Sequence, residues 1–78
     1  MTDLQIQDAI IQECVALYQL KRPCPCPHSG RRCWPVNAWY IPGGAKPFCY
    51  KEDVLNEHIA NYRAGDKRFI TRTCTARE

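Results

Sequence analysis

The sequence predicts a small, cysteine-rich α+β domain in which two helices flank a proline- and cysteine-rich loop and a short β-hairpin. Three observations predict it. Apolar residues recur at helical spacing from 3 to 20, prolines and cysteines crowd residues 23 to 37, and aromatic residues stand on both sides of a Pro-Gly-Gly turn. The 78 residues are expected to form one cysteine-stapled domain, residues 1–78.

The first helix is predicted over residues 3 to 20. Thr2 and Gln5 have the spacing of a capping box. The apolar face consists of two adjoining stripes, which are Ile6, Ile10, Cys14 and Leu17, and Ile11, Val15 and Tyr18. Pro23 should end the helix, because its ring forces Arg22 away from helical backbone angles.

The second half of the chain is predicted to hold the other elements. Residues 38 to 50 resemble a hairpin in composition, since strand-favouring aromatic residues surround Pro42-Gly43-Gly44, a typical turn sequence. Residues 52 to 64 predict the second helix, with Gly65 as its C-terminal cap. Residues 69 to 75 alternate and are rich in threonine, which is compatible with a short C-terminal strand.

The charge and hydropathy of the chain exclude some classes of function. The formal net charge is +3, which is compatible with an acidic partner but smaller than that of a dedicated nucleic-acid binder. A DNA mimic would need a strongly acidic surface. No stretch approaches the ~20 apolar residues of a membrane span, so no membrane association is expected.

The expected localisation depends on whether Met1 is the native start. The first residues lack the basic region and the apolar run of a secretion signal. A native Met1 predicts a cytoplasmic protein, whereas removal of a signal peptide would place the chain in the periplasm or outside the cell. The two cases predict opposite redox states for the cysteines.

Six cysteines are the main sign of how so small a domain is stabilised. A domain of this size buries only about 60–65% of the surface of its unfolded chain, so it usually needs disulfides, a metal or a partner. Four cysteines in the spacing C-x-C-x6-C-x15-C are expected to meet in space and fasten the proline-rich segment: Cys24, Cys26, Cys33 and Cys49. Cys14 and Cys74 are candidates for an additional disulfide.

Three states of the four loop cysteines stay open from the sequence. They can form two disulfides, for which three pairings exist. They can instead hold zinc as four thiolates, with His28 or His58 as substitute ligands, or they can be free thiols. No cofactor is expected in the disulfide case, and zinc is expected in the second.

A longer pattern surrounds these cysteines. It consists of Cys24-Pro25-Cys26-Pro27, Gly30, Cys33, Ala38, Trp39, Pro42-Gly43-Gly44, Pro47, Cys49-Tyr50 and Asp53-Val54. Over residues 24 to 54 the chain resembles a group of small bacterial proteins of unknown function, many of them made with secretion signals. The resemblance implies a cysteine-pinned scaffold, disulfide-bonded in the secreted members, and it implies no activity.

Two positions depart from the pattern of that group. The link from Pro27 to Gly30 is shorter than the Asp/Asn-rich stretch that usually lies there, and Trp34 stands where a glycine is usual. A function carried by the longer loop is therefore not transferred to this chain.

An enzymatic function is not predicted. The sequence contains no G-x-S-x-G, no H-E-x-x-H and no phosphate-binding loop. Cys26 and His28 are close, but a proline lies between them and no third group orients the histidine.

Residues of the types enriched at interface hot spots gather in the loop and the expected hairpin. They are Arg31, Arg32, Trp34, Trp39, Tyr40 and Lys46. The alternative is that Trp39 and Tyr40 cover the small core while the arginines are only solvated.

Three functions are therefore weighed. The preferred one is a non-enzymatic protein-binding module, by class-level analogy a small inhibitor carried by a phage or mobile element, as anti-CRISPR proteins are. The first alternative is a secreted or periplasmic structural module stabilised by disulfides. The second alternative is a zinc-bound nucleic-acid-binding module with a tryptophan stacking on a base. Its phosphate contacts would come from Arg31, Arg32, Lys46, Lys67, Arg68 and Arg72.

Overall fold

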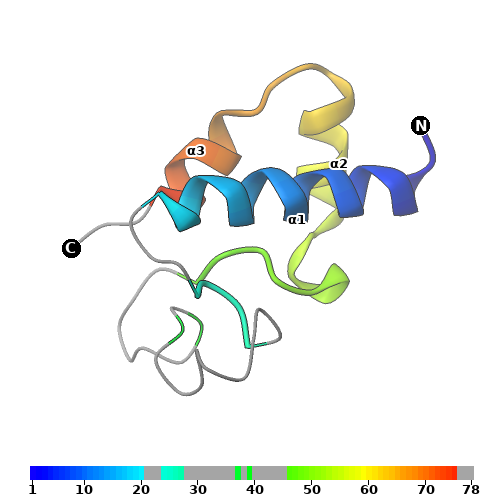
Figure 1. Ribbon diagram of the computed structural model, residues 1–78. Helices are drawn as coiled ribbons and strands as arrows, with labels where there is room; N and C mark the ends of the chain where they lie inside the picture. Colours follow the sequence, from blue (N-terminus) through cyan, green and yellow to red (C-terminus); the bar gives the residue numbers. More distant parts are fainter. Residues whose placement is uncertain (21–23, 28–36, 38, 40–45, 76–78) are drawn as a thin grey trace.

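The computed structural model describes residues 1–20, 24–27, 37, 39 and 46–75 (Figure 1). Their regular elements are α1 (Asp3–Gln19), the short 3-10 helix η3 (Lys51–Asp53), α2 (Asn56–Arg63) and α3 (Arg68–Cys74). No strand occurs in the part of the chain that the structure describes. The α+β prediction is therefore wrong, because the described fold is helical.

The long helix α1 is the element on which the others pack. Figure 1 shows α1 crossing the molecule, with α3 beside its C-terminal half and α2 behind it. The core lies between the three helices and the segment that precedes η3. Its buried members are Ile6, Ile10, Cys14, Tyr18, Phe48, Val54, Ile59, Ile70 and Cys74.

The prediction for α1 is confirmed. The Gln5 backbone N–H donates to the Thr2 hydroxyl at 3.2 Å, and the Thr2 N–H donates to the Gln5 side chain at 2.8 Å, so the capping box is formed. The helix is amphipathic, since its fully buried residues recur at every fourth position: Ile6, Ile10, Cys14 and Tyr18.

The expected C-terminal strand is the helix α3. Ile70 and Cys74 are four residues apart and both are buried, which is the spacing of one helical face. The helix begins where Asp66 accepts the Arg68 backbone N–H at 3.1 Å. Burial against α1 thus overrides the strand propensity of a segment rich in β-branched residues.

The predicted helix over 52 to 64 is divided in two. Its first residues belong to η3, and Val54 and Leu55 are extended before α2 begins. The Leu55 backbone N–H donates to His58 Nδ1 at 3.0 Å, so the histidine caps α2 from within its first turn.

The predicted cap at the end of α2 is present. Gly65 has a φ of +85°. Its N–H donates to the Tyr62 carbonyl at 3.0 Å, and the Asp66 N–H donates to the Asn61 carbonyl at 2.9 Å. These two bonds define a Schellman motif, which favours glycine at the left-handed position.

The predicted hairpin strand before η3 is absent, because its backbone donors are used elsewhere. Pro47 has no N–H, and the Phe48 N–H donates to Cys14 Sγ at 3.1 Å. The N–H groups of Cys49 and Tyr50 both donate to the Asp53 carboxylate, at 3.2 Å and 3.0 Å. The N–H groups of residues 48 to 50 are therefore not available for a ladder. The expected turn at 42–44 lies outside the described residues.

Candidate functional site

Two disulfide bonds organise the described molecule. Cys14 and Cys74 join α1 to α3, and Cys26 and Cys49 join segment 24–27 to segment 46–49. All four of these cysteines are buried. The additional disulfide considered from the sequence is thus present, and two of the four loop cysteines are linked to each other.

The remaining loop cysteines are placed only in part. Cys24 is also disulfide-bonded, while Cys33 lies outside the described residues. Over the described ranges, no three side chains of histidine, cysteine or acidic residues come together as a metal site. Because the sulfurs of Cys26 and Cys49 are bonded to each other, the zinc alternative concerns the reduced chain, in which they would be thiolates.

A compact aromatic group lies beside the Cys26–Cys49 bond. The Trp39 backbone N–H donates to the Pro25 carbonyl at 3.1 Å, which fixes the backbone of the tryptophan next to Cys26. The Trp39 ring meets the Tyr50 ring edge-to-face at a centroid distance of 5.6 Å. Lys46 Nζ lies 4.9 Å from the centroid of the Trp39 ring. We call Trp39, Lys46 and Tyr50 the aromatic corner.

The aromatic corner has one side toward the protein and one toward solvent. Trp39 is partly buried, Lys46 is exposed and Tyr50 is 37% exposed. Pro25, which accepts the Trp39 backbone N–H, and Pro47, which follows Lys46 in the chain, are both fully buried. Trp39 is therefore neither a fully buried core residue nor a fully exposed one, and its role as a contact stays a prediction.

Of the six predicted binding residues, the structure places two. Trp39 and Lys46 come together, and Tyr50, which the sequence analysis did not select, completes the group. The other four predicted residues lie outside the described part: Arg31, Arg32, Trp34 and Tyr40. Tyr50 was detectable in principle, because it directly follows a cysteine of the framework and so shares its anchor.

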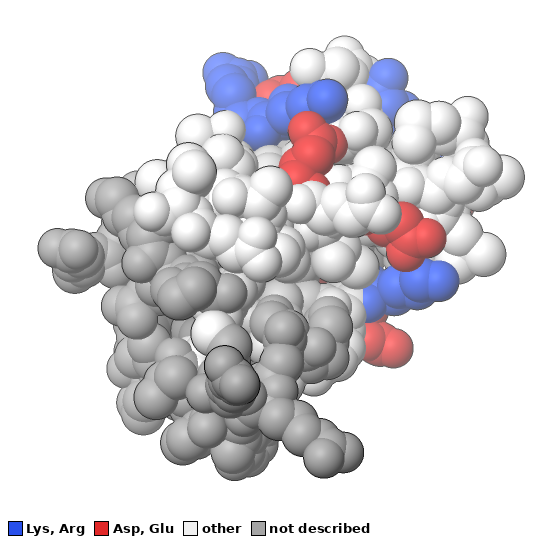
Figure 2. Space-filling model, viewed as in Figure 1, with Lys and Arg blue, Asp and Glu red and all other residues white. Residues whose placement is uncertain are grey.

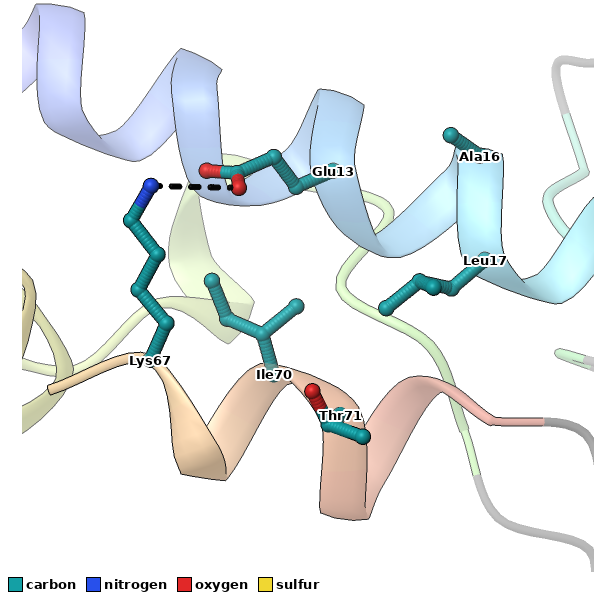
Figure 3. A pocket seen from close by; sticks show the side chains of 6 residues that line it. All are labelled: Glu13, Ala16, Leu17, Lys67, Ile70 and Thr71. Atoms are coloured by element: carbon teal, nitrogen blue, oxygen red, sulfur yellow. Dashed lines mark hydrogen bonds and ion pairs between the residues drawn. The ribbon is translucent and has the colours of Figure 1, made fainter.

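A groove lies between α1 and α3. Figure 3 shows the side chains that line it, which are Glu13, Ala16, Leu17, Lys67, Ile70 and Thr71. Its volume is about 400 Å³, and its exposed lining is mostly apolar. An ion pair between Lys67 Nζ and Glu13 Oε1 at 3.4 Å crosses one end. This groove was not predicted from the sequence, because residues 69–75, which contribute Ile70 and Thr71 to one wall, were expected to form a strand.

The charged end of the groove perturbs two ionisable groups. The negative charge of Glu13 raises the pKa of Lys67 above its usual value. Hydrogen bonding with Glu13, followed by burial, raises the pKa of Tyr62. Lys67 Nζ also lies 4.8 Å from the centroid of the Tyr62 ring. The ion pair, the phenol ring and the apolar groove thus form one continuous feature.

Most described basic side chains are compensated by acidic ones. Ion pairs join Lys51 to Asp8, Arg63 to Asp3, Lys67 to Glu13 and Arg68 to Asp66. Lys67 and Arg68 had been candidates for phosphate contacts. Each of these two side chains has a carboxylate partner, which reduces the positive charge that they would offer to a phosphate.

Comparison with protein-family models, curated proteins and solved structures finds no match to this chain. None of the helices in the described ranges has the length and apolar character needed to cross a bilayer. Within the described residues, the features that bear on function are the two disulfides with both cysteines placed, the aromatic corner and the groove.

Proposed function

We propose that this chain is a non-enzymatic protein-binding module that contacts its partner through the aromatic corner. The observation that carries the proposal is the fastening of Trp39, Lys46 and Tyr50 to non-helical segments that are joined by the Cys26–Cys49 disulfide. Tryptophan and tyrosine are enriched among the residues that contribute most to binding energy.

The disulfide favours binding by reducing its entropic cost. Segments 24–27 and 46–49 contain no helix or strand. They are held by the covalent bond, by the Trp39–Pro25 hydrogen bond, and by the bonds from Phe48 and Cys49 to Cys14 and Asp53. A side chain that is already ordered loses less freedom when a partner arrives. The Lys46 ammonium over the indole ring favours a partner with a carboxylate at this position.

Two further functions stand beside this proposal, one as a special form of it and one as an alternative to it. A small inhibitor of a host system, including one of the anti-CRISPR type, is one form that such a module takes, and this is analogy by class only. A structural module of an oxidising compartment is favoured by a different observation, the two disulfides, because such bonds persist outside the reducing cytosol.

To test the proposal, the oxidised protein is immobilised and used to capture binding partners from the soluble and the secreted fractions of the source cells. Three single variants are compared, Trp39→Ala, Lys46→Glu and, as a control, Arg68→Ala on α3. The wild type and the control should retain one partner in stoichiometric amount. The two corner variants should weaken its binding at least about tenfold, as hot-spot residues do.

Two outcomes would contradict the proposal. One is the absence of any stoichiometric partner from both fractions, which would favour the structural module. The other is a partner whose affinity is the same for the wild type and for both corner variants. Lys46→Glu is decisive if Trp39→Ala unfolds the protein, since Lys46 is exposed and its side chain is not part of the core.

A further inference from the structure

The two disulfides with both cysteines placed have different surroundings. Cys14 and Cys74 lie on α1 and α3 and belong to the apolar cluster that the helices share. Cys26 and Cys49 lie in segments without helix or strand, and within the described residues they are not part of that cluster. Both pairs are buried, so a reductant reaches either one only when part of the chain opens. Irregular segments open at a lower free-energy cost than packed helices, so Cys26–Cys49 should be reduced first.

The Cys26–Cys49 bond connects the two halves of the aromatic corner. One half is Trp39, whose backbone N–H donates to the carbonyl of Pro25, directly before Cys26, at 3.1 Å. The other half consists of the lysine and the tyrosine of the corner, which lie on either side of Cys49 in the chain. The Pro25 carbonyl oxygen is also 3.9 Å from Cys49 Sγ, so the tryptophan backbone is anchored at the disulfide itself. Opening the bond therefore removes a covalent link between this anchor and the other half of the corner.

The half of the corner next to Cys49 has its own attachment to the helical part. The Phe48 N–H donates to Cys14 Sγ at 3.1 Å. The N–H groups of Cys49 and Tyr50 donate to the Asp53 carboxylate at 3.2 Å and 3.0 Å. None of these hydrogen bonds uses the sulfur of Cys49, so reduction at Cys49 leaves their donors and acceptors unchanged. The tyrosine should therefore stay in place when the tryptophan is released.

The helical part is held by contacts that do not depend on the Cys26–Cys49 bond. They are the Cys14–Cys74 bond, the apolar cluster and exposed ion pairs, and Figure 2 shows basic and acidic side chains next to one another on this part of the surface. The ion pairs that join α1 to the other elements are Asp8 with Lys51, Asp3 with Arg63 and Glu13 with Lys67. Exposed pairs contribute little, so the cluster and the Cys14–Cys74 bond stabilise the helices most. The three helices should therefore stay folded when Cys26–Cys49 opens.

We propose that the Cys26–Cys49 bond is a redox switch for the aromatic corner, which a dithiol reductant opens while α1 and α3 stay joined and folded. One thiolate of the reductant attacks a sulfur of the pair and forms a mixed disulfide, and its second thiol then displaces the protein sulfur. Two electrons and two protons pass to the protein, so Cys26 and Cys49 end as thiols and the reductant ends as an internal disulfide. The effect of the switch on binding rests on the proposed function, whereas the opening of the corner does not.

The switch ties binding to the redox state of the compartment. In an oxidising compartment the Cys26–Cys49 bond persists, and the corner is ordered before a partner arrives. In a compartment rich in reduced dithiols the bond opens, and the partner has to order the tryptophan itself. That added entropic cost should weaken binding at least about tenfold.

The opening of the corner is tested without any partner. The oxidised protein is treated with increasing amounts of dithiothreitol, its free thiols are trapped by alkylation, and mass spectrometry gives a reduction rate for each disulfide. Hydrogen exchange of the backbone amides is measured where Cys26–Cys49 is open and the helix-to-helix bond is intact. Two variants are compared with the wild type. Cys26→Ser/Cys49→Ser keeps the switch open, and the control Cys24→Ser/Cys33→Ser removes the two other loop cysteines.

Cys26–Cys49 should be reduced at least about tenfold faster than Cys14–Cys74, in the wild type and in the control variant. Once the bond is open, the Trp39 backbone amide should exchange at least about tenfold faster, while the amides of α1 and the far-ultraviolet circular dichroism stay unchanged. The open variant should show the fast Trp39 exchange without reductant. Reduction of both bonds at the same rate, or a Trp39 amide that stays protected when the bond is open, would overturn the proposal.

A binding measurement separates the failure of the switch from the failure of the proposed function. A partner captured by the oxidised protein should bind at least about tenfold more weakly to the reduced protein and to Cys26→Ser/Cys49→Ser. Equal affinity for the oxidised and reduced forms would overturn the control of binding by the switch. The absence of any partner would contradict the proposed function alone, because the reduction and exchange rates decide whether the corner opens.

Discussion

Replacing Cys14 and Cys74 together should remove much of the stability of this protein. The bond between them joins the first helix to the last across a sequence separation of 60. In the chain-entropy treatment, a bridge of that length restricts the unfolded state by about 4 kcal/mol at 25 °C. A chain of this length is stable by only about 4–12 kcal/mol. The double alanine variant should therefore be close to the limit of folding.

A second contribution comes from the sulfur itself. Cys14 Sγ accepts the Phe48 backbone N–H at 3.1 Å within the core. In Cys14→Ala/Cys74→Ala that donor loses its acceptor, which costs about 1–3 kcal/mol for a buried group. In Cys14→Ser/Cys74→Ala the hydroxyl can accept the same N–H, so this variant should be the more stable of the two by about 1 kcal/mol.

The assay is urea unfolding followed by far-ultraviolet circular dichroism, with thermal unfolding beside it. A loss of about 4 kcal/mol corresponds to roughly 15–30 °C in Tm for a domain of this size. The m-value should rise, because the uncrosslinked chain exposes more surface when unfolded. The Cys26–Cys49 bond spans a shorter sequence separation of 23. Removing it in Cys26→Ala/Cys49→Ala should lower the free energy of unfolding by about 3 kcal/mol in the same chain-entropy treatment. A change below about 1 kcal/mol with an unaltered m-value in Cys14→Ala/Cys74→Ala would refute the reasoning.

Three further predictions concern single residues. Gly65→Ala should cost about 1 kcal/mol, seen as a Tm lower by about 4–8 °C, because the positive φ disfavours a side chain although no atom lies within 4 Å of the added carbon; an unchanged Tm would contradict the cap. The hydrogen bond from Arg68 lowers the pKa of Asp66. The stabilisation by the Asp66 carboxylate is therefore present above the pKa of the unfolded chain and is lost as pH falls through the pKa of the folded protein. Asp66→Asn should make stability depend less on pH below about pH 4, and the same pH dependence in variant and wild type would contradict this. Glu13 raises the pKa of Lys67. The stabilisation by this ion pair is therefore present below the pKa of the unfolded chain and is lost as pH rises through the pKa of the folded protein. Glu13→Gln should make stability depend less on pH above about pH 10, and a pH dependence as steep as in the wild type would show that the pair contributes nothing.

The sequence was sufficient to predict α1, because several local signals in it agree. The capping box at Thr2 and Gln5, the fourfold spacing of apolar residues and a proline after the helix all predict the same element. The cap at Gly65 could also be predicted, because it depends only on a glycine at the end of a helix. Cys14 was seen on the inner face of this helix, which made its pairing with Cys74 a natural candidate.

The errors arose where a distant contact decides the local structure. Residues 69–75 favour strand by composition, but the bond to Cys14 and the burial of Ile70 make a helix the better packed state. Residues 48–50 also favour strand, yet Asp53 and Cys14 take the backbone donors that a hairpin needs. No local sequence pattern predicts that side chains will accept hydrogen bonds from those backbone N–H groups. The groove between α1 and α3 could not be predicted either, because α3 itself was not predicted.

The sequence predicted that aromatic and basic residues would gather near the cysteines, but it identified only two of the three residues of the aromatic corner. Trp39 and Lys46 were selected as candidate contacts, and the structure brings them together at 4.9 Å. Tyr50 was assigned to a strand rather than to the surface. Its position follows from Cys49, whose partner among the loop cysteines could not be chosen by counting residues.

The pairing of Cys26 with Cys49 is the claim on which the fastening of the aromatic corner depends, and disulfide mapping of the unreduced protein tests it most directly. Cleavage after Trp39 and Tyr40 separates Cys33 from Cys49, and fragmentation between Cys24 and Cys26 distinguishes the two neighbours. The account predicts one linked pair of peptides joining Cys26 to Cys49. A Cys49 that is found as a free thiol, or bonded to a cysteine other than Cys26, would contradict it.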